Sequence, residues 1–217
     1  MSLLTSNTKI DKSVELFPEH EAVILQMLPG KGVCKDYFNC LSTCLAFTGY
    51  GKFTSVRKGR QKRKDLYLQD LPAFMKTLEK ELNNLCKRAL KKGKKPVCRL
   101  NGFTDIDWQF PEYFINGVSL FEAYQMIQFW DYTADIDKAL SNQFENYHLT
   151  FSYKNGKHGN NLESCRNAFS MGLNIAVVDL PENRETFKGQ SISGDTHDFR
   201  WKDPKGKIVW LTEKRAK

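Results

Sequence analysis

The stretch EAVILQMLPG, residues 21–30, sets the direction of the fold. Its apolar run is interrupted only by Gln26, which is typical of a buried strand, and Pro29-Gly30 ends the strand. The run is far too short to cross a bilayer, so no membrane partner is expected. We therefore expect a globular fold that is built outward from this strand.

Downstream of it, segments with strand patterns alternate with segments that have helix patterns. The expected strands cover residues 96–100, 125–133, 147–153 and 174–180. The clearest helix begins at Asp70 as its N-cap, carries one apolar stripe and ends at Gly93. Shorter helices are expected after Ser119 and within residues 135–144 and 161–172. This alternation predicts an α/β fold, either a partial (β/α) barrel or a curled parallel sheet.

A chain of 217 residues is expected to form a single domain, 1–217, with the α/β core over residues 20–180. The tail differs from the core. It has an Asp-Pro-Lys-Gly turn at residues 203–206 between two short apolar or alternating runs. That pattern predicts a C-terminal β-hairpin over residues 190–212.

The loop after the first strand, residues 32–47, contains Cys34, Cys40 and Cys44 in a C-x5-C-x3-C pattern. The beginning of the chain has no visible secretory signal, so the expected compartment is the cytoplasm. Clustered thiols in a reducing compartment favour a metal over disulfides. Three thiolates fit a four-iron, four-sulfur cluster (4Fe-4S) with one iron left open, and zinc is the alternative.

Polar residues follow the later strands, and ligands of parallel α/β folds bind at the carboxyl ends of the strands. The candidate catalytic residues are Asp105, Asp131 and Tyr132. The candidates for binding a cofactor or substrate are Asn101, Gly102, Thr104 and Ser152. We expect these residues to line one mouth together with the cysteine loop.

The net charge is +8, and the excess is concentrated in two segments, residues 56–64 and 87–95, with six Lys or Arg each. Such clusters attract polyanions, so nucleic acid or a nucleotide is the expected partner, and an ordinary solvated surface is the alternative. The candidate contacts lie in the first segment: Arg57, Lys58, Arg60, Lys62, Arg63 and Lys64.

A second candidate site lies in the tail, where Asp195, His197 and Asp198 surround Arg200. Carboxylates and an imidazole could hold a divalent metal or bind a ligand. The alternative is a turn network in which Asp198 pairs with Arg200.

A three-cysteine loop after the first strand and a polar, glycine-containing loop after the second resemble the radical S-adenosylmethionine enzymes. In those enzymes three cysteines hold the cluster, and the second loop meets the methionine amino group of the cofactor. NGFTDI, residues 101–106, stands where that second loop would be. This resemblance implies an iron-sulfur cluster and S-adenosylmethionine as cofactors. The cysteine spacing here is longer than the C-x3-C-x2-C usual in that superfamily.

The chain also resembles the phage-encoded gene product 88 type proteins, which carry C-x5-C-x3-C followed by Tyr-Ala and a nearby Gly. Here Leu45-Ala46 and Gly49 follow the third cysteine. Further similarity covers residues 99–108, 129–133 and 194–211. The resemblance implies a phage or mobile-element origin, a location in the host-cell cytoplasm, and work on nucleic acid or nucleotides.

The leading functional hypothesis is an iron-sulfur enzyme, of the radical S-adenosylmethionine kind, that acts on a nucleotide or nucleic acid. One alternative is a base-modifying or base-exchanging enzyme with structural zinc and a catalytic aspartate, Asp105 or Asp131. Another is a non-enzymatic nucleic-acid-binding protein with a structural metal site. A serine hydrolase, a P-loop enzyme and a zinc protease are disfavoured, because their motifs are absent from the sequence.

Overall fold

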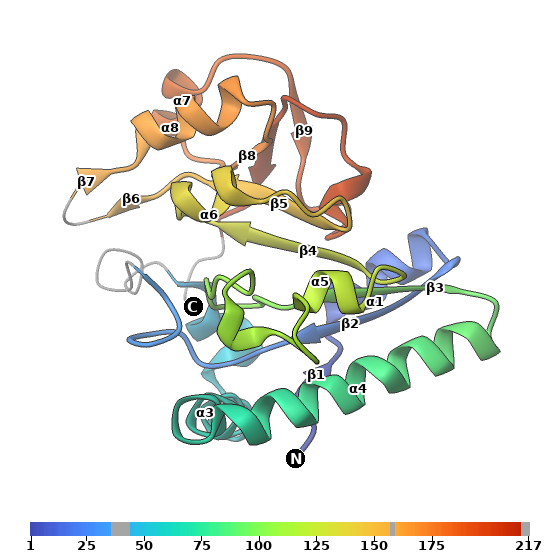
Figure 1. Cartoon of the computed structure of the whole chain (residues 1–217). Coiled ribbons are helices and arrows are strands. Elements are labelled where there is room, and N and C mark those ends of the chain that lie inside the picture. Colours follow the sequence, from blue (N-terminus) through green and yellow to red (C-terminus); the bar gives the residue numbers. More distant parts are fainter. Residues whose placement is uncertain (36–43, 157–158, 214–217) are drawn as a thin grey trace.

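The computed structural model describes residues 1–35, 44–156 and 159–213, and eight of its strands form one sheet (Figure 1). The order across the sheet is β1-β2-β3-β4-β5-β8-β10-β9. The bounds are β1 (Leu4–Thr5), β2 (His20–Leu25), β3 (Lys95–Arg99), β4 (Gln128–Thr133), β5 (Tyr147–Ser152), β8 (Ile175–Val178), β9 (Ser191–Ser193) and β10 (Ile208–Leu211). Strand β1 runs antiparallel to β2, and every other neighbouring pair is parallel. The α/β prediction is confirmed, with an open sheet that does not close into a barrel.

The predicted C-terminal hairpin is wrong. Strands β9 and β10 are neighbours, but they run parallel, and β10 lies between β9 and β8. The Asp-Pro-Lys-Gly turn joins β10 to a short 3-10 helix, η5 (Arg200–Lys202), instead of joining two strands. Because both edges of β10 bond to parallel neighbours, no antiparallel partner fits there. A separate small ribbon pairs β6 (Asn155–Gly156) with β7 (Gly159–Asn160).

The connecting helices lie on one face of the sheet, called here the α4 face. They are α4 (Leu71–Lys91), α5 (Leu120–Ala123), α6 (Ile136–Ser141), α7 (Leu162–Ser170) and α8 (Pro181–Thr186). Successive residues of β2 show the two faces: Val23 and Leu25 pack with α4, whereas Ile24 packs with Ile10 on the other side. Helices on one face are expected when parallel strands follow one another across a sheet with right-handed crossovers.

The opposite face, called here the α1 face, is covered by α1 (Thr8–Leu16) and by η5. Trp130 of β4 is fully buried there against Phe199 and Trp201. The tail therefore packs on the sheet as part of the core.

Helix α4 forms where its caps and stripe predict it. The Asp70 carboxylate accepts a hydrogen bond of 2.9 Å from the Ala73 backbone N–H, and Gly93 follows the helix with φ of 63°. The stripe is fully buried at Phe74, Leu78 and Leu82. The same helix also carries Cys86, which packs against the core as expected.

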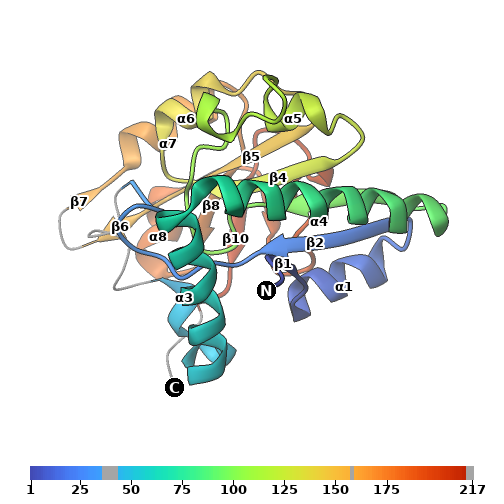
Figure 2. The same cartoon turned by 60° about the horizontal axis from the view of Figure 1, so that its bottom comes forward.

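The basic segment 56–64 belongs to a helix, α3 (Thr54–Gln69), which precedes α4 and follows two 3-10 turns, η2 (Leu45–Phe47) and η3 (Gly49–Lys52). Figure 2 shows α4 running alongside β2, with α3 projecting away from the start of α4. A further 3-10 turn, η4, covers Pro111–Tyr113. Within the described part of the chain, no helix is long and apolar enough to span a bilayer.

Candidate functional site

The cysteine loop begins directly after β2, at the carboxyl edge of the sheet. The Cys34 Sγ lies 4.0 Å from the backbone oxygen of Phe103, and the Val33 oxygen accepts a 2.9 Å hydrogen bond from the Asp105 N–H. These contacts join the loop to the segment after β3, which is the position expected for a ligand site in a parallel sheet. Cys34 and Cys44 are both partly buried. Cys40 lies outside the described residues.

Arg60 of α3 packs against the end of the cysteine loop. Only 6% of this residue is exposed, and its Nη1 donates a 2.8 Å hydrogen bond to the backbone oxygen of Ala46. Its guanidinium carbon lies 4.2 Å from the centre of the Phe103 ring. Burial lowers the pKa of Arg60, as does the charge of Arg63, and the charge on Cys44 acts in the opposite direction. One buried cation is therefore shared between the cysteine loop and the loop after β3.

Gly51 makes the close wrapping of this loop possible. A Cβ at this position would lie 2.0 Å from the Ala46 oxygen and 3.1 Å from the Arg60 Nη1. Gly102, one of the candidate binding residues, is equally confined, because a Cβ there would lie 2.7 Å from the Leu25 oxygen. Both glycines let backbone segments approach one another where side chains have no room.

Two described thiols, Cys34 and Cys44, are of the donor type that a thiolate-bound metal requires. Metals bind the thiolate form, which nearby positive charge stabilises, and Arg60 supplies such a charge beside Cys44. Cys34 and Cys44 are the described residues that could ligate it, with Cys40 between them in the sequence. Across residues 1–35, 44–156 and 159–213, no group of three His, Cys, Asp or Glu side chains is gathered to hold a metal ion.

Asp131 of β4 is fully buried and holds the loop after β3 in place. Its Oδ1 accepts the Asn101 N–H at 2.6 Å, and its Oδ2 accepts the Asn101 Nδ2 and the Tyr147 hydroxyl, each at 2.9 Å. Burial raises the pKa of Asp131 to about 6, although Lys138 and Arg99 oppose the shift. Thr104 donates a 2.8 Å hydrogen bond to the Asn101 Oδ1. Asp131, Asn101 and Thr104, all candidate residues, thus form one connected hydrogen-bond network.

Asp105 belongs to the same buried region and has a charged partner of its own. The Lys138 Nζ donates a 3.0 Å bond to the Asp105 Oδ1, and the Thr133 hydroxyl and the Ala134 N–H donate to the Oδ2 at 3.1 and 2.9 Å. The Lys138 side chain is completely buried. The structure thus brings both candidate carboxylates together and occupies them with donors from the protein itself.

Tyr132 and Asp131 point to opposite faces of the sheet, as neighbouring residues of a strand do. Tyr132 lies on the α1 face, where the Arg99 guanidinium carbon is 4.7 Å from the centre of its ring. The expectation that both residues line one mouth is therefore wrong. Ser152 ends β5, is 9% exposed, and its backbone oxygen accepts a 2.9 Å bond from Asn161.

The tail residues form two ion-paired groups on the α1 face. Asp198 is buried between the Arg99 Nη1 at 2.8 Å and the Lys9 Nζ at 3.3 Å. Arg200 lies 3.0 Å from Asp203, which also faces the His197 Nε2 at 3.5 Å. Burial lowers the pKa of His197 to about 4 and raises that of Asp203 to about 6.

The Asp195 carboxylate accepts a 2.8 Å bond from the Thr212 N–H. The network interpretation of the tail thus describes this geometry better than a metal site does. Asp198, however, pairs with Arg99 and Lys9, where the sequence interpretation paired it with Arg200.

The six basic candidates of α3 divide into two sets. Arg57, Lys58 and Lys62 are exposed, whereas Arg60, Arg63 and Lys64 are at least partly buried against the protein. The Arg63 Nε donates a 2.8 Å bond to the Ser2 oxygen, and a Cβ on Gly30 would lie 3.0 Å from the Lys64 Nζ. Only the first set is free to meet an extended polyanion.

Sequence reasoning missed Lys138 and Tyr147 as parts of the buried network. Lys138 sits in a short helix whose charges look like those of any solvated surface. Tyr147 begins a strand, where an aromatic residue is ordinary. A buried carboxylate requires donors and a compensating charge, but its sequence does not say which residues supply them.

Comparisons with known proteins give one match. A family model described as Gene product 88 matches residues 1–217. No curated protein and no solved structure matches the chain. The family match includes the whole cysteine loop, and nothing in these comparisons supports the resemblance to radical S-adenosylmethionine enzymes.

Proposed function

This chain belongs to the Gene product 88 family of phage proteins, and from that premise we propose that it is an iron-sulfur enzyme acting on a nucleotide or nucleic acid. The observation that carries the proposal is the position of the cysteine loop. Cys34 and Cys44 lie at the carboxyl edge of a parallel sheet, the first against Phe103 and the second within the field of the buried Arg60.

Cys34, Cys40 and Cys44 are the proposed ligands of the cluster. A four-iron cluster held by three thiolates keeps one iron open to a substrate or to S-adenosylmethionine. Arg60 favours the charged form of the Cys44 thiol. Gly102 and Phe103 hold the loop after β3 close to Cys34.

The exposed cations of α3 supply the attraction for a polyanionic substrate. Arg57, Lys58 and Lys62 lie on the helix that also carries Arg60, so a nucleic acid bound along α3 would lie next to the cysteine loop. Contacts of this kind act on phosphates without reading sequence, and they weaken as salt is added.

Metal and sulfide analysis of the full chain, purified without oxygen, tests the cluster. We expect about four iron and four sulfide per chain with a brown absorption band. Cys40→Ala and Cys44→Ala should lose both, whereas Cys86→Ala should keep both, because Cys86 belongs to α4 and lies outside the C-x5-C-x3-C pattern. One zinc per colourless chain would replace the iron-sulfur proposal by the zinc alternative, and metal-free protein would remove the site. S-adenosylmethionine cleavage by the reduced brown protein tests the cofactor.

Charge reversal on α3 tests the substrate class. Arg57→Glu should weaken binding of a single-stranded oligonucleotide and flatten its dependence on salt, measured by fluorescence anisotropy at several salt concentrations. Lys12→Glu makes the same charge change at an exposed residue of α1 and serves as the control. Equal binding by both variants and the parent would speak against α3 as the recruiting surface.

A further inference from the structure

A cavity of about 260 Å³ lies beside α3 and is lined by Arg60, Arg63, the hydroxyl residues Thr5, Ser6 and Ser55, and Gln26. It is bounded by the segment after β1 on one side and by the first turns of α3 on the other. It adjoins the cysteine loop through Arg60, which bonds to Ala46 and feels the charge of Cys44.

The two arginines of this cavity have no carboxylate partner within ion-pair distance among the described residues. Their acceptors are neutral backbone oxygens: Ala46 for Arg60, and Ser2 and Gln26 for Arg63. The Arg60 Nε is buried and has no hydrogen-bond acceptor among the described residues. Burial lowers the pKa of both side chains, and the charge of Arg63 lowers that of Arg60 further.

Arg60 is buried and Arg63 is partly buried beside it, and the charges of Cys44 and Glu81 act on them from beyond ion-pair distance. A bound oxyanion would offset the cost of holding the two cations together. Guanidinium groups match the geometry of phosphate oxygens. The first turn of α3 adds unsatisfied backbone N–H groups, since its N-cap residue, Phe53, gives no side-chain cap. The Ser55 hydroxyl lies in that turn and has no partner in the described chain, whereas Thr5 donates to Ile24 and Ser6 to Asp11.

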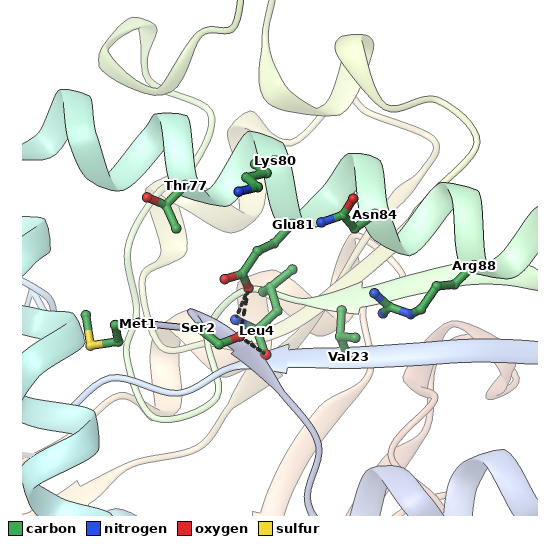
Figure 3. A pocket seen from close by; sticks show the side chains of 9 residues that line it. All are labelled: Met1, Ser2, Leu4, Val23, Thr77, Lys80, Glu81, Asn84 and Arg88. Atoms are coloured by element: carbon green, nitrogen blue, oxygen red, sulfur yellow. Dashed lines mark hydrogen bonds between the residues drawn. The ribbon is translucent and has the colours of Figure 1, made fainter.

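A larger cavity, of about 500 Å³, provides a contrast (Figure 3). Two of its charged residues, Arg88 and Glu81, already have partners, and Lys80 is the remaining charged residue of the lining. Arg88 lies 3.4 Å from Glu21, and the Glu81 carboxylate accepts the backbone N–H groups of Leu3 and Leu4. The smaller cavity, with two arginines that have no carboxylate at ion-pair distance, therefore favours an oxyanion more strongly than the larger one.

We infer that the smaller cavity binds the phosphate group of a phosphate ester, held by Arg60 and Arg63 and by the first turn of α3. The volume is below the roughly 300–1,000 Å³ of a typical small-molecule pocket, so it takes the phosphate and the adjoining part of the ester, not a whole nucleotide. Its role as the anchor of the substrate that reaches the cysteine loop rests on the function proposed above.

Calorimetric titration of the full chain, purified without oxygen, tests the inference with inorganic phosphate, AMP and adenosine. We expect phosphate and AMP to bind, AMP at least as tightly as phosphate, and adenosine not to bind. Binding of phosphate but not AMP would overturn the assignment to an ester. The absence of phosphate and AMP binding at millimolar concentration would overturn the site itself.

Ser55→Asp places a carboxylate in the cavity at a helix position that tolerates acidic residues, so the variant should fold. We expect it to weaken AMP binding at least tenfold. Thr54→Asp adds the same charge one residue earlier, outside the lining, and should change the affinity less than threefold. If both variants weakened AMP binding equally, the added negative charge alone would explain the loss wherever it stands on the helix. That result would overturn the site.

Iron measured on the same samples separates this inference from the proposed function. Ser55→Asp should keep the metal content of the parent while losing AMP. Metal-free protein that still binds AMP would support the cavity and contradict the iron-sulfur proposal.

Discussion

At the scale of single residues, Asp131 shows how a strand-end carboxylate can look catalytic in sequence and be structural in the fold. It has three donors in the native protein, two from Asn101 and one from Tyr147. An asparagine offers one acceptor oxygen in place of two, so at least one donor would lose its partner. The carboxylate thus fixes the loop after β3, against which the cysteine loop packs.

Asp131→Asn should lower the free energy of unfolding at pH 7 by about 1–3 kcal/mol, the usual cost of an unsatisfied buried donor. The pKa of Asp131 is raised from 3.8 to about 6 in the folded chain. Its contribution is therefore fully present below pH 4 and is lost as the pH rises through 6.

The gap between parent and variant should accordingly widen by about 2–3 kcal/mol as the pH falls from 7 to 4. Urea denaturation of both proteins across this range measures the gap. His148 and His197, whose pKa values are lowered to about 4, contribute equally to the pH dependence of both proteins. Their contributions therefore cancel in the difference between parent and variant. A gap that narrows toward acid pH would contradict the buried carboxylate.

At the scale of elements, α3 and α4 differ in how much their own sequences determine. Helix α4 was predictable from the Asp70 cap, the apolar stripe and Gly93. Helix α3 was not predictable, because it lacks a side-chain cap and its first half is dominated by Lys and Arg without an apolar stripe. It is held by its packing: Arg60 against the cysteine loop, and the Tyr67 ring against Phe74. Packing of this kind stabilises helices that their local sequence does not predict.

Two glycines of this region should respond to alanine in opposite ways. Gly51→Ala should lower the free energy of unfolding by about 1–3 kcal/mol or more, since a Cβ would meet the Ala46 oxygen at 2.0 Å. Gly59→Ala, inside α3 with nothing within 4 Å of the new Cβ, should raise it by about 0.5–1 kcal/mol. Thermal melts followed by circular dichroism measure both, and a loss of stability in both variants would contradict the packing described for α3.

At the scale of the whole molecule, three charged residues join distant parts of the chain across the α1 face. Asp198 of the tail pairs with Arg99 of β3 and with Lys9 of α1. Sequence reasoning predicted the sheet class from the alternation of strands and helices. It did not predict the parallel β9–β10 pair or this triad, because both depend on contacts between residues far apart in the chain.

Asp198→Ala should lower the free energy of unfolding by about 3–5 kcal/mol, since it leaves the largely covered Arg99, with 13% of its side chain exposed, without its carboxylate. Asp179→Ala breaks a surface pair with the exposed Arg184 and should lower the free energy of unfolding by less than about 1 kcal/mol. Chemical denaturation of the two variants under the same conditions measures the difference. A small effect of Asp198→Ala would mean that the tail adds little to the stability of the sheet.

The strand order has a consequence for how the chain acquires its shape as it leaves the ribosome. From β2 through β8, each parallel strand of the sheet finds its neighbour already synthesised, so the sheet can grow by addition at one edge. Strand β9 breaks this sequence, because its neighbour among the described strands of the sheet is β10, which is made after it. A nascent chain that has reached Lys207 therefore carries β9 without a place to dock, and the emergence of residues 208–211 completes two strands at once.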